Sequence, residues 1–211
     1  MAERFDLIVF DWDGTLMDSA GAIVCAMQAA TRDLGLAEIP EERARYVIGL
    51  GLGDALRHAV PDLDEASYPR MVERYRHHYL SSDHELTLFD GVAGMIDALA
   101  ARGHMLAVAT GKSRLGLDRA LGHSGLGAYF HATRCADECF SKPHPAMLEE
   151  LMDELGAVPE RTLMIGDTTH DLQLAVNAGA ACDGVSYGAH PSEDFHRFEP
   201  LFVAHSTREL H

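Results

Sequence analysis

The chain has 211 residues, of which 47% are hydrophobic and 24% are charged. This composition supports a buried core and excludes the intrinsically disordered class. Asp and Glu outnumber Lys and Arg by 33 to 17, which gives a formal net charge of -16. A surface this acidic repels phosphate backbones and anionic lipid headgroups, so we expect neither nucleic acid nor a membrane as a partner.

Targeting signals and disulfides are not expected either. The apolar run Leu7–Phe10 is too short for a signal-peptide core, and aspartates stand on both sides of it. No stretch approaches the ~20 apolar residues that a transmembrane helix needs. The four cysteines do not suggest a disulfide scaffold, and Cys135 and Cys139 lack the second half-site of a zinc centre. We therefore predict a cytoplasmic protein with reduced thiols.

The first predicted element is a strand at Phe5–Phe10, an apolar run broken only by Asp6. Such a run is typical of a strand that is buried on both faces. The region from about residue 16 to residue 88 then contains only helical patterns. We predict a helical module inserted after the first strand, with joints near Leu16–Asp18 and Leu88–Gly91.

Three helices are predicted within this inserted region. Apolar residues at helical spacing indicate a helix over 23–34, with Ser19 as its N-cap and Gly35 as its end. A second helix is expected from Pro40 to Ile48, and a third over 71–79.

After the insertion, strand patterns alternate with helical ones. Strands are predicted at Met105–Ala109 and Thr162–Ile165, and helices at Val92–Leu99, Met147–Leu155 and Leu172–Val176. A glycine follows each of these helices and ends it. The alternation predicts an α/β fold, in which helices cover both faces of a parallel sheet.

Two aspartates follow the first strand directly, in the segment Asp11-Trp12-Asp13-Gly14-Thr15-Leu16. Side chains alternate along an extended segment, so Asp11 and Asp13 are expected on the same side. Two carboxylates at such close range raise the pKa of one of them or recruit a cation. The alternative interpretation is an Asp-Gly turn with helix-capping carboxylates.

A second pair of aspartates follows the strand at 162–165. Asp167 and Asp171 are four residues apart, so both can face the strand end if a helix begins between them. Four carboxylates that converge would bind a hard divalent cation, and Mg²⁺ suits a site that also holds a phosphate. Alternatively, Asp171 only caps a helix N-terminus.

Two further segments carry groups that could hold an anion. Thr110 and Gly111 end the strand that begins at Met105, and a hydroxyl followed by glycine at a helix start offers donors to an anion. Lys142 is followed by prolines at 143 and 145, which fix it ahead of a helix. A surface position is the alternative for this lysine. Because ligands gather at the carboxyl ends of parallel strands, these groups together indicate phosphoryl transfer.

This set of motifs resembles the haloacid dehalogenase superfamily, in its phosphatase branch, and most closely the phosphoglycolate-phosphatase-like hydrolases. The four family motifs are similar to the segments that contain Asp11 and Asp13, Thr110 and Gly111, Lys142, and Asp167 and Asp171. The resemblance implies a Rossmann-like core at 1–15 and 89–211 and a small helical cap at 16–88.

The resemblance also implies roles for these residues. Asp11 would be the nucleophile that forms an aspartyl-phosphate. Asp13 would protonate the leaving alkoxide and then deprotonate the attacking water. Its presence argues against dehalogenation, which needs no acid at this position.

The same resemblance implies a cofactor and a phosphate site. Mg²⁺ would be bound by Asp11, Asp167 and the backbone carbonyl of Asp13. Asp171 would either bind the ion directly or contact one of its direct ligands. Thr110, the Gly111 N–H and Lys142 would hold the oxygens of the transferring phosphoryl group.

Substrate specificity is expected from the cap, because the cap closes over the site. The candidate loop contains Gly49, Gly51 and Gly53, and Arg43 or Arg45 could anchor an anionic leaving group such as a carboxylate. Alternatively, the two arginines are solvated helix residues. No role is assigned to the histidines.

The predicted function is Mg²⁺-dependent hydrolysis of a small phosphomonoester, such as phosphoglycolate. The alternatives are a sugar-phosphate mutase similar to beta-phosphoglucomutase and an inorganic pyrophosphatase, both of which use the same core. A non-enzymatic phosphate-binding protein is disfavoured, because Asp11 and Asp13 are both present.

Overall fold

A six-stranded parallel sheet forms the centre of the fold, as a computed structural model that describes residues 4–210 shows. The strand order is β3-β2-β1-β4-β5-β6. The strands are β1 (Leu7–Phe10), β2 (Met105–Thr110), β3 (Ala132–Cys135), β4 (Thr162–Gly166), β5 (Ala181–Val185) and β6 (Val203–Ala204). The predicted α/β class is confirmed, and the three predicted strands are β2, β1 and β4, which are neighbours within the sheet.

The other three strands were not predicted from the sequence. β3 and β6 lie at the edges of the sheet, and β3 has half-buried Thr133 and Arg134 at its centre. β5 contains the buried Asp183, whose Oδ1 accepts a hydrogen bond from the backbone N–H of Phe202 at 3.0 Å. Polar residues interrupt the apolar runs that mark a buried strand, and tertiary contacts compensate for them here.

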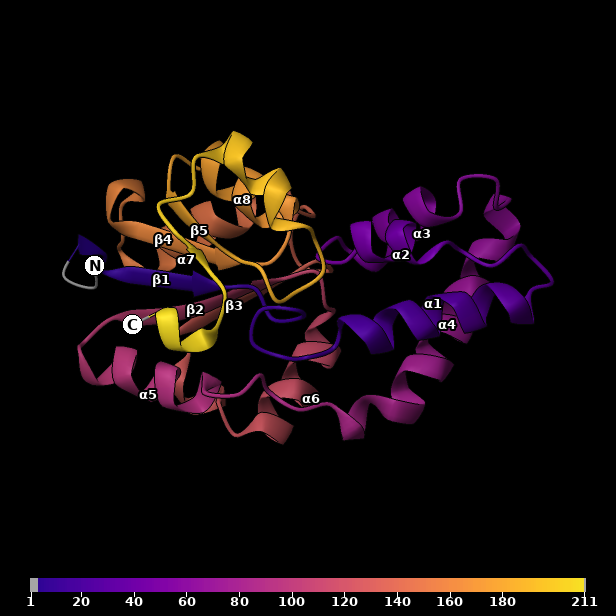
Figure 1. The fold of residues 1–211 in the computed structure, drawn as a ribbon, viewed down its shortest axis with the longest axis horizontal. Coiled ribbons are helices and arrows are strands. Elements are labelled where there is room, and N and C mark those ends of the chain that lie inside the picture. Colours follow the sequence, from indigo (N-terminus) through magenta and orange to yellow (C-terminus); the bar gives the residue numbers. More distant parts are fainter. Residues whose placement is uncertain (1–3, 211) are drawn as a thin grey trace.

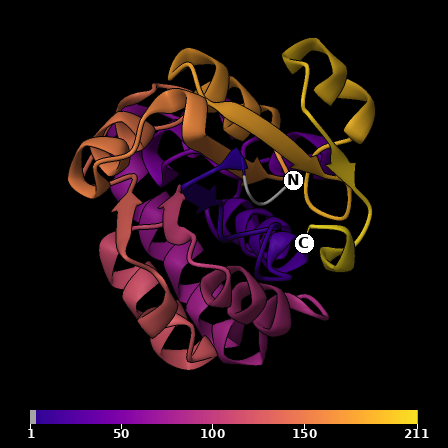
Figure 2. The same cartoon turned by 90° about the vertical axis from the view of Figure 1, so that its left-hand side faces the viewer.

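Helices cover both faces of the sheet. On one face lie α5 (Val92–Ala101) and α6 (Arg114–Ser124), and on the other lie α7 (Ala146–Leu155) and α8 (Thr169–Asn177). Figure 2 shows the first pair in magenta to pink below the sheet and the second pair in orange above it. β1 supplies side chains to both layers, because Ile8 and Phe10 face α5 whereas Leu7 and Val9 face the other layer.

Four helices between β1 and α5 form a separate lobe, which lies to the right of the core in Figure 1. They are α1 (Ala20–Asp33), α2 (Glu41–Tyr46), α3 (Leu52–Ala59) and α4 (Tyr68–Ser82). The lobe has its own apolar core, which includes Met27, Leu56 and Met71. Helix α3 was not predicted, because glycines at 51 and 53 flank its first residue. None of the helices within residues 4–210 has the length and apolar character of a membrane span.

The chain enters and leaves this lobe through two segments that run side by side. The N–H of Phe89 donates to the carbonyl of Leu16, and the N–H of Asp18 donates to the carbonyl of Thr87, both at 3.0 Å. Met17 and Leu88 form an isolated antiparallel bridge. We therefore propose these paired segments as the borders between the core and a cap at 16–88.

Candidate active site

The sheet register brings the motif-bearing strands to one edge. Phe10 pairs with Val108 of β2 and with Ile165 of β4, so these three strands end at nearly the same level. The N–H of Asp11 extends the pairing with β4 by donating to the carbonyl of Ile165 at 2.9 Å. The residues after the three strand ends therefore share one site.

Three buried carboxylates converge at this edge. Asp11, Asp167 and Asp171 each contribute one oxygen to a group whose members all lie within 4.8 Å of one another. Asp167 is held in place by the Thr15 hydroxyl, which donates to Oδ1 at 2.8 Å, and by the Ala189 N–H, which donates to Oδ2 at 2.7 Å.

The expected convergence of four carboxylates is corrected to three. The strand ends at Phe10, so the two-residue alternation does not extend to Asp13. The chain instead turns at Gly14, whose φ is +83°, and a Cβ there would lie 2.2 Å from Oδ2 of Asp167. The carboxylate of Asp13 accordingly faces other partners.

Asp171 caps the N-terminus of α8, as one of the two interpretations expects, and it also belongs to the group of three carboxylates. Its Oδ2 accepts from the Thr168 N–H at 3.0 Å as part of a capping box at the start of α8. Its Oδ1 lies 2.6 Å from Nζ of Lys142. One carboxylate therefore caps the helix and takes part in the acidic cluster.

Lys142 is a buried residue and not a surface lysine. Its Nζ lies 2.9 Å from Oδ1 of Asp11 and 2.6 Å from Oδ1 of Asp171. Burial alone would lower the pKa of Lys142, but the carboxylates of Asp11 and Asp171 outweigh this effect and raise it. The lysine is therefore a fixed positive charge beside Asp11.

The single positive charge of Lys142 does not neutralise the three carboxylates of Asp11, Asp167 and Asp171. Burial raises the pKa of Asp11 well above its ordinary value, and the charges of Asp171 and Asp167 add to this effect although Lys142 opposes it. Burial and the charge of Asp171 likewise raise the pKa of Asp167 to about 7. Among the described residues, neither oxygen of Asp11 accepts a well-aligned hydrogen bond. Lys142 lies beside Oδ1 of Asp11, and Oδ2 has no donor among residues 4–210, an environment that fits a hard divalent cation.

Asp13 is held by a serine and a lysine. The hydroxyl of Ser19 donates to Oδ1 at 2.7 Å, and Nζ of Lys112 lies 3.0 Å from Oδ1 and 3.1 Å from Oδ2. Ser19 occupies the N-cap position of α1 as predicted, but its hydroxyl does not bond to the helix backbone and donates to Asp13 instead. Sequence reasoning also missed Lys112, although it follows Thr110 and Gly111 in the same turn.

The lysine that binds Asp13 also contacts the cap. Nζ of Lys112 donates to the hydroxyl of Tyr79, on α4, at 3.0 Å. Burial alone would lower the pKa of Lys112, but Asp13 and Tyr79 raise it, so that its charge is kept. A continuous polar chain therefore runs from Asp13 through Lys112 to Tyr79.

The loop at 49–51 packs directly on the core at this point. A Cβ on Gly111 would lie 2.4 Å from the carbonyl oxygen of Leu50, so a larger residue at 111 would push the loop away. The N–H of Gly51 donates to the hydroxyl of Ser141 at 2.8 Å. Thr110 is buried at the end of β2, and its Oγ1 accepts from the Lys112 N–H at 3.2 Å.

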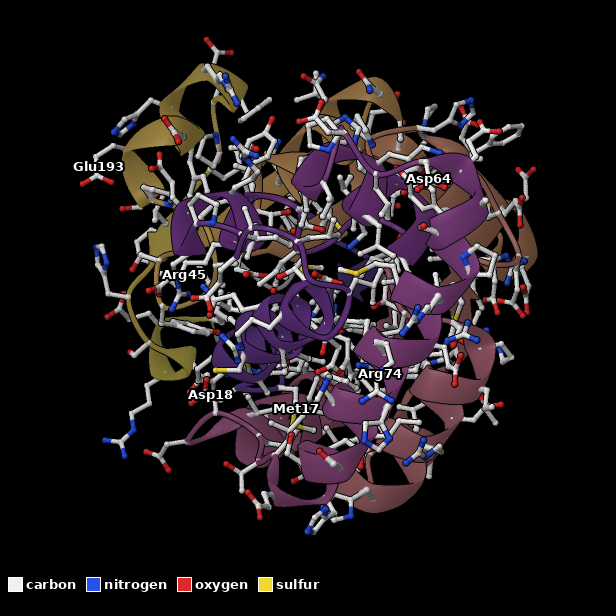
Figure 3. All side chains as sticks on the ribbon, turned by 90° about the vertical axis from the view of Figure 1, so that its right-hand side faces the viewer. Met17, Asp18, Arg45, Asp64, Arg74 and Glu193 are labelled. Carbon is white, nitrogen blue, oxygen red and sulfur yellow. The ribbon has the colours of Figure 1, made fainter. Side chains whose placement is uncertain are left out.

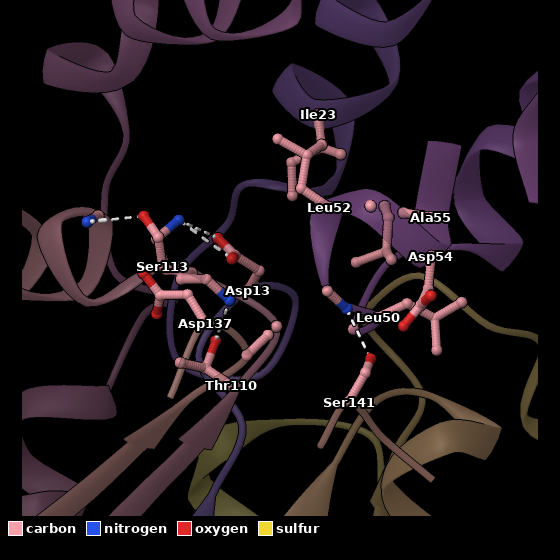
Figure 4. A pocket seen from close by; sticks show the side chains of 18 of the residues that line it. Asp13, Ile23, Leu50, Leu52, Asp54, Ala55, Thr110, Ser113, Asp137 and Ser141 are labelled. Atoms are coloured by element: carbon pink, nitrogen blue, oxygen red, sulfur yellow. Dashed lines mark hydrogen bonds and ion pairs between the residues drawn. The ribbon is translucent and has the colours of Figure 1, made fainter. Parts of the chain in front are cut away.

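A cavity of about 800 Å³ lies between the core and the cap. Asp11, Asp13 and Thr110 line it from the core. The three glycines of the expected specificity loop line it from the cap, namely Gly49, Gly51 and Gly53. Figure 4 shows this cavity from close by.

The expected anchors Arg43 and Arg45 do not line this cavity. Arg43 is exposed, and Nε of Arg45 lies 2.8 Å from Oε1 of Glu41 along α2, as expected of solvated helix residues. In Figure 3, Arg45 and Arg74 lie on separate parts of the cap. The arginines that line the cavity are Arg57, Arg76 and Arg119.

Comparisons with known proteins agree with this geometry. Residues 8–185 match the family described as Haloacid dehalogenase-like hydrolase. The chain is 36% identical over 210 residues to a protein of Dickeya dadantii named Probable phosphatase IndB, which covers 97% of this chain and 91% of that protein. It is 32% identical over 217 residues to the Phosphoglycolate phosphatase of Vibrio vulnificus, with 99% and 95% covered.

A solved structure gives the same result for the fold. The predicted phosphoglycolate phosphatase of Haemophilus somnus superposes with a TM-score of 0.87 at 26% identity, and the match covers 98% of this chain and 96% of that one. The chain therefore belongs to the haloacid dehalogenase-like hydrolases and is a phosphatase of that family.

Proposed function

We propose that this phosphatase hydrolyses a small phosphomonoester with the help of Mg²⁺, by way of an aspartyl-phosphate on Asp11. The observation that supports this most is the environment of Asp11. Its carboxylate opens into the cavity, lies 2.9 Å from Lys142 and receives no well-aligned hydrogen bond from residues 4–210. Its Oδ2, which has no donor among the described residues, is therefore available to a phosphorus atom.

Asp11 and Asp13 have separate roles in the proposed reaction. Asp11 attacks the phosphorus, and the bond from phosphorus to the leaving oxygen breaks. Asp13 donates a proton to that oxygen, then accepts one from the water that attacks the aspartyl-phosphate. This second step releases inorganic phosphate and restores both side chains. Both residues line the cavity from the core, so both can reach the two ends of the scissile bond.

Three groups would stabilise the transferring phosphoryl group. Lys142 supplies a fixed charge beside Asp11, and the backbone N–H of Gly111 adds a donor. The hydroxyl of Thr110 accepts from the Lys112 N–H, so its own proton remains available to a phosphoryl oxygen. Mg²⁺ held by Asp11, Asp167 and the Asp13 carbonyl, with Asp171 alongside, would reduce the repulsion between the anionic nucleophile and the anionic phosphate.

The test is a phosphatase screen over some tens of phosphorylated metabolites, including phosphoglycolate, which the Vibrio relative suggests. Released inorganic phosphate distinguishes hydrolysis from mutase activity, and pyrophosphate belongs in the panel. We expect turnover with Mg²⁺, none with chelator, and none in Asp11→Asn, although that variant folds.

The matched control for Asp11→Asn is Asp153→Asn, which changes an exposed aspartate on α7 in the same way and is expected to keep full activity. Substantial turnover in Asp11→Asn would overturn the role of Asp11 as the nucleophile.

A further inference from the structure

Two buried histidines of the core meet the cap at one backbone carbonyl. His170 is the second residue of α8, and His190 lies in the segment that follows β5. Nε2 of His170 lies 2.7 Å from the carbonyl oxygen of Tyr46, and Nε2 of His190 lies 3.0 Å from the same atom. Tyr46 is the last residue of α2, where a helix leaves its carbonyls without partners inside the helix. The two imidazoles therefore satisfy one such carbonyl.

The hydrogen bonds of the two rings determine which nitrogen carries a proton. A carbonyl oxygen can only accept, so Nε2 of each histidine is the donor. Nδ1 of His190 in turn accepts from the backbone N–H of Thr169 at 3.1 Å. The ring of Tyr46 stacks on His190 and meets His170 edge-on, with ring centroids 5.3 Å apart in each case. Each imidazole is therefore held with its donor toward the cap.

These histidines belong to the two segments that hold the acidic cluster. His170 directly precedes Asp171 in the chain. The N–H of Ala189 donates to Oδ2 of Asp167 at 2.7 Å, and the N–H of His190 donates to the carbonyl of Asp167 at 3.3 Å. The position of the two donors is therefore tied to the position of these carboxylates.

The carbonyl that they bind leads directly into the wall of the cavity. Residues 47–51 follow Tyr46, and all of them line the cavity, as Asp11 does. Gly49 lies against the residue that precedes α8, since a Cβ there would be 3.1 Å from Oγ1 of Thr168. A shift of the Tyr46 carbonyl would therefore move a surface that faces the leaving group.

We propose that His170 and His190 are positioning residues for the leaving group, which hold the cap segment 47–51 against the phosphate site through the carbonyl of Tyr46. This inference depends on the proposed phosphatase function. Neither histidine lines the cavity, so both act through that segment and not on the substrate. Because both donate to one oxygen, each holds the segment in part when the other is lost.

The test measures kcat/KM for p-nitrophenyl phosphate, whose leaving group is large, and for acetyl phosphate, whose leaving group is small. The double variant with His170→Leu and His190→Leu removes both donors. We expect the ratio of the first kcat/KM to the second to fall about 30-fold in this variant, mainly through KM, and about threefold in each single variant. The Mg²⁺ concentration for half-maximal activity should not change.

Amide hydrogen exchange gives a second readout that needs no turnover. The N–H of Leu50 bonds to the carbonyl of Val47, and the N–H of Gly51 bonds to the hydroxyl of Ser141. We expect the peptide that covers 47–51 to exchange about tenfold faster in the double variant. Unchanged exchange in this peptide overturns the inference, whether or not either probe is hydrolysed.

Two further variants distinguish positioning from a general loss of stability. His190→Gln returns an amide donor in place of Nε2 and should restore most of the ratio that His190→Leu loses. His104→Leu is the matched control, because His104 is also buried and its Nδ1 lies 2.9 Å from the carbonyl oxygen of Phe5, before the first residue of β2. This control should leave the ratio and the exchange of 47–51 unchanged.

The outcomes separate this inference from the proposed function. If the natural chain hydrolyses neither probe, the proposed function fails, and exchange at 47–51 still decides whether the histidines hold the segment. If both probes lose activity equally, or if more Mg²⁺ is needed, the histidines act on the acidic cluster and the inference is wrong. An equal effect of His104→Leu also overturns it. The single variants carry the same comparison if the double variant does not fold.

Discussion

The ammonium group of Lys112 lies 3.0 Å from one carboxylate oxygen of Asp13 and 3.1 Å from the other. Both residues follow central strands of the sheet, β2 and β1, and their side chains meet in the space between core and cap. The carboxylate that we propose as the acid and base is therefore positioned by a residue that also contacts the cap.

Replacing Lys112 with Met should lower kcat by roughly tenfold to 100-fold with an alkyl phosphate, because Asp13 loses the ion pair that orients it. The effect should be much smaller with p-nitrophenyl phosphate, whose leaving group needs little protonation. Steady-state kinetics with both substrates measure this contrast. Lys112→Arg should recover part of the activity, and equal losses with both substrates would contradict a positioning role.

Replacing Lys142 with Met should reduce the free energy of unfolding by about 3 kcal/mol at neutral pH, because it leaves buried carboxylates without their cation. Urea denaturation measures this loss. Arg161→Met, which breaks the exposed pair with Asp6, should have no measurable effect. A similar small effect for both variants would mean that Lys142 does not balance the acidic cluster.

The stability of the protein should depend on pH through Asp183. Burial raises the pKa of this carboxyl from 3.8 to about 6, although the hydrogen bond from the Phe202 N–H opposes the shift. The folded state therefore binds this proton more tightly than the unfolded state. The stabilisation is present at pH values below about 4 and is lost as the pH rises through about 6.

The size of this contribution is about 3 kcal/mol at most. Asp183→Asn should remove it, so the unfolding free energy of the variant should fall less between pH 4 and pH 7 than that of the natural chain. Asp153→Asn, on the surface of α7, should not change this slope. Parallel pH curves for natural chain and Asp183→Asn would show that the carboxyl titrates normally.

Mg²⁺ should stabilise the natural chain against heat. At a Mg²⁺ concentration 100 times the dissociation constant, the free energy of unfolding should rise by about 2.7 kcal/mol. This corresponds to a rise in Tm of roughly 5–10 °C for a chain of this size. Asp167→Asn should lose most of this rise, whereas Asp183→Asn should keep it. Differential scanning fluorimetry with Mg²⁺ and with chelator makes the comparison, and an equal rise in both variants would exclude Asp167 as a ligand.

The residues at the strand ends could be predicted from the sequence because the relevant information is local. An apolar run fixes where a strand ends, and parallel pairing brings consecutive ends together. Asp11, Thr110 and Asp167 follow that rule, and each lines or adjoins the site. The orientation of Asp13 could not be predicted, since it depends on the turn at Gly14.

The contacts between the cap and the core could not be predicted from sequence patterns. A helical stripe shows which side of a helix is apolar, but not which part of the core that helix meets. Arg43 and Arg45 precede the glycine loop in the sequence, but in space Arg57 of α3 and Arg76 of α4 reach the cavity. Lys112 was overlooked because its partners, Asp13 and Tyr79, are distant in sequence.

The paired entry and exit of the inserted helices have an evolutionary consequence. Leu16 and Phe89 are joined by a backbone hydrogen bond, so the chain enters and leaves the insertion at neighbouring positions. Helices of another length or composition can therefore join the chain there without changing the order of the strands, although Ser19 and Tyr79 of the insertion also contact Asp13 and Lys112. An exchange of this contiguous block would change the cap side of the cavity and would have to keep a partner for Asp13 and for Lys112.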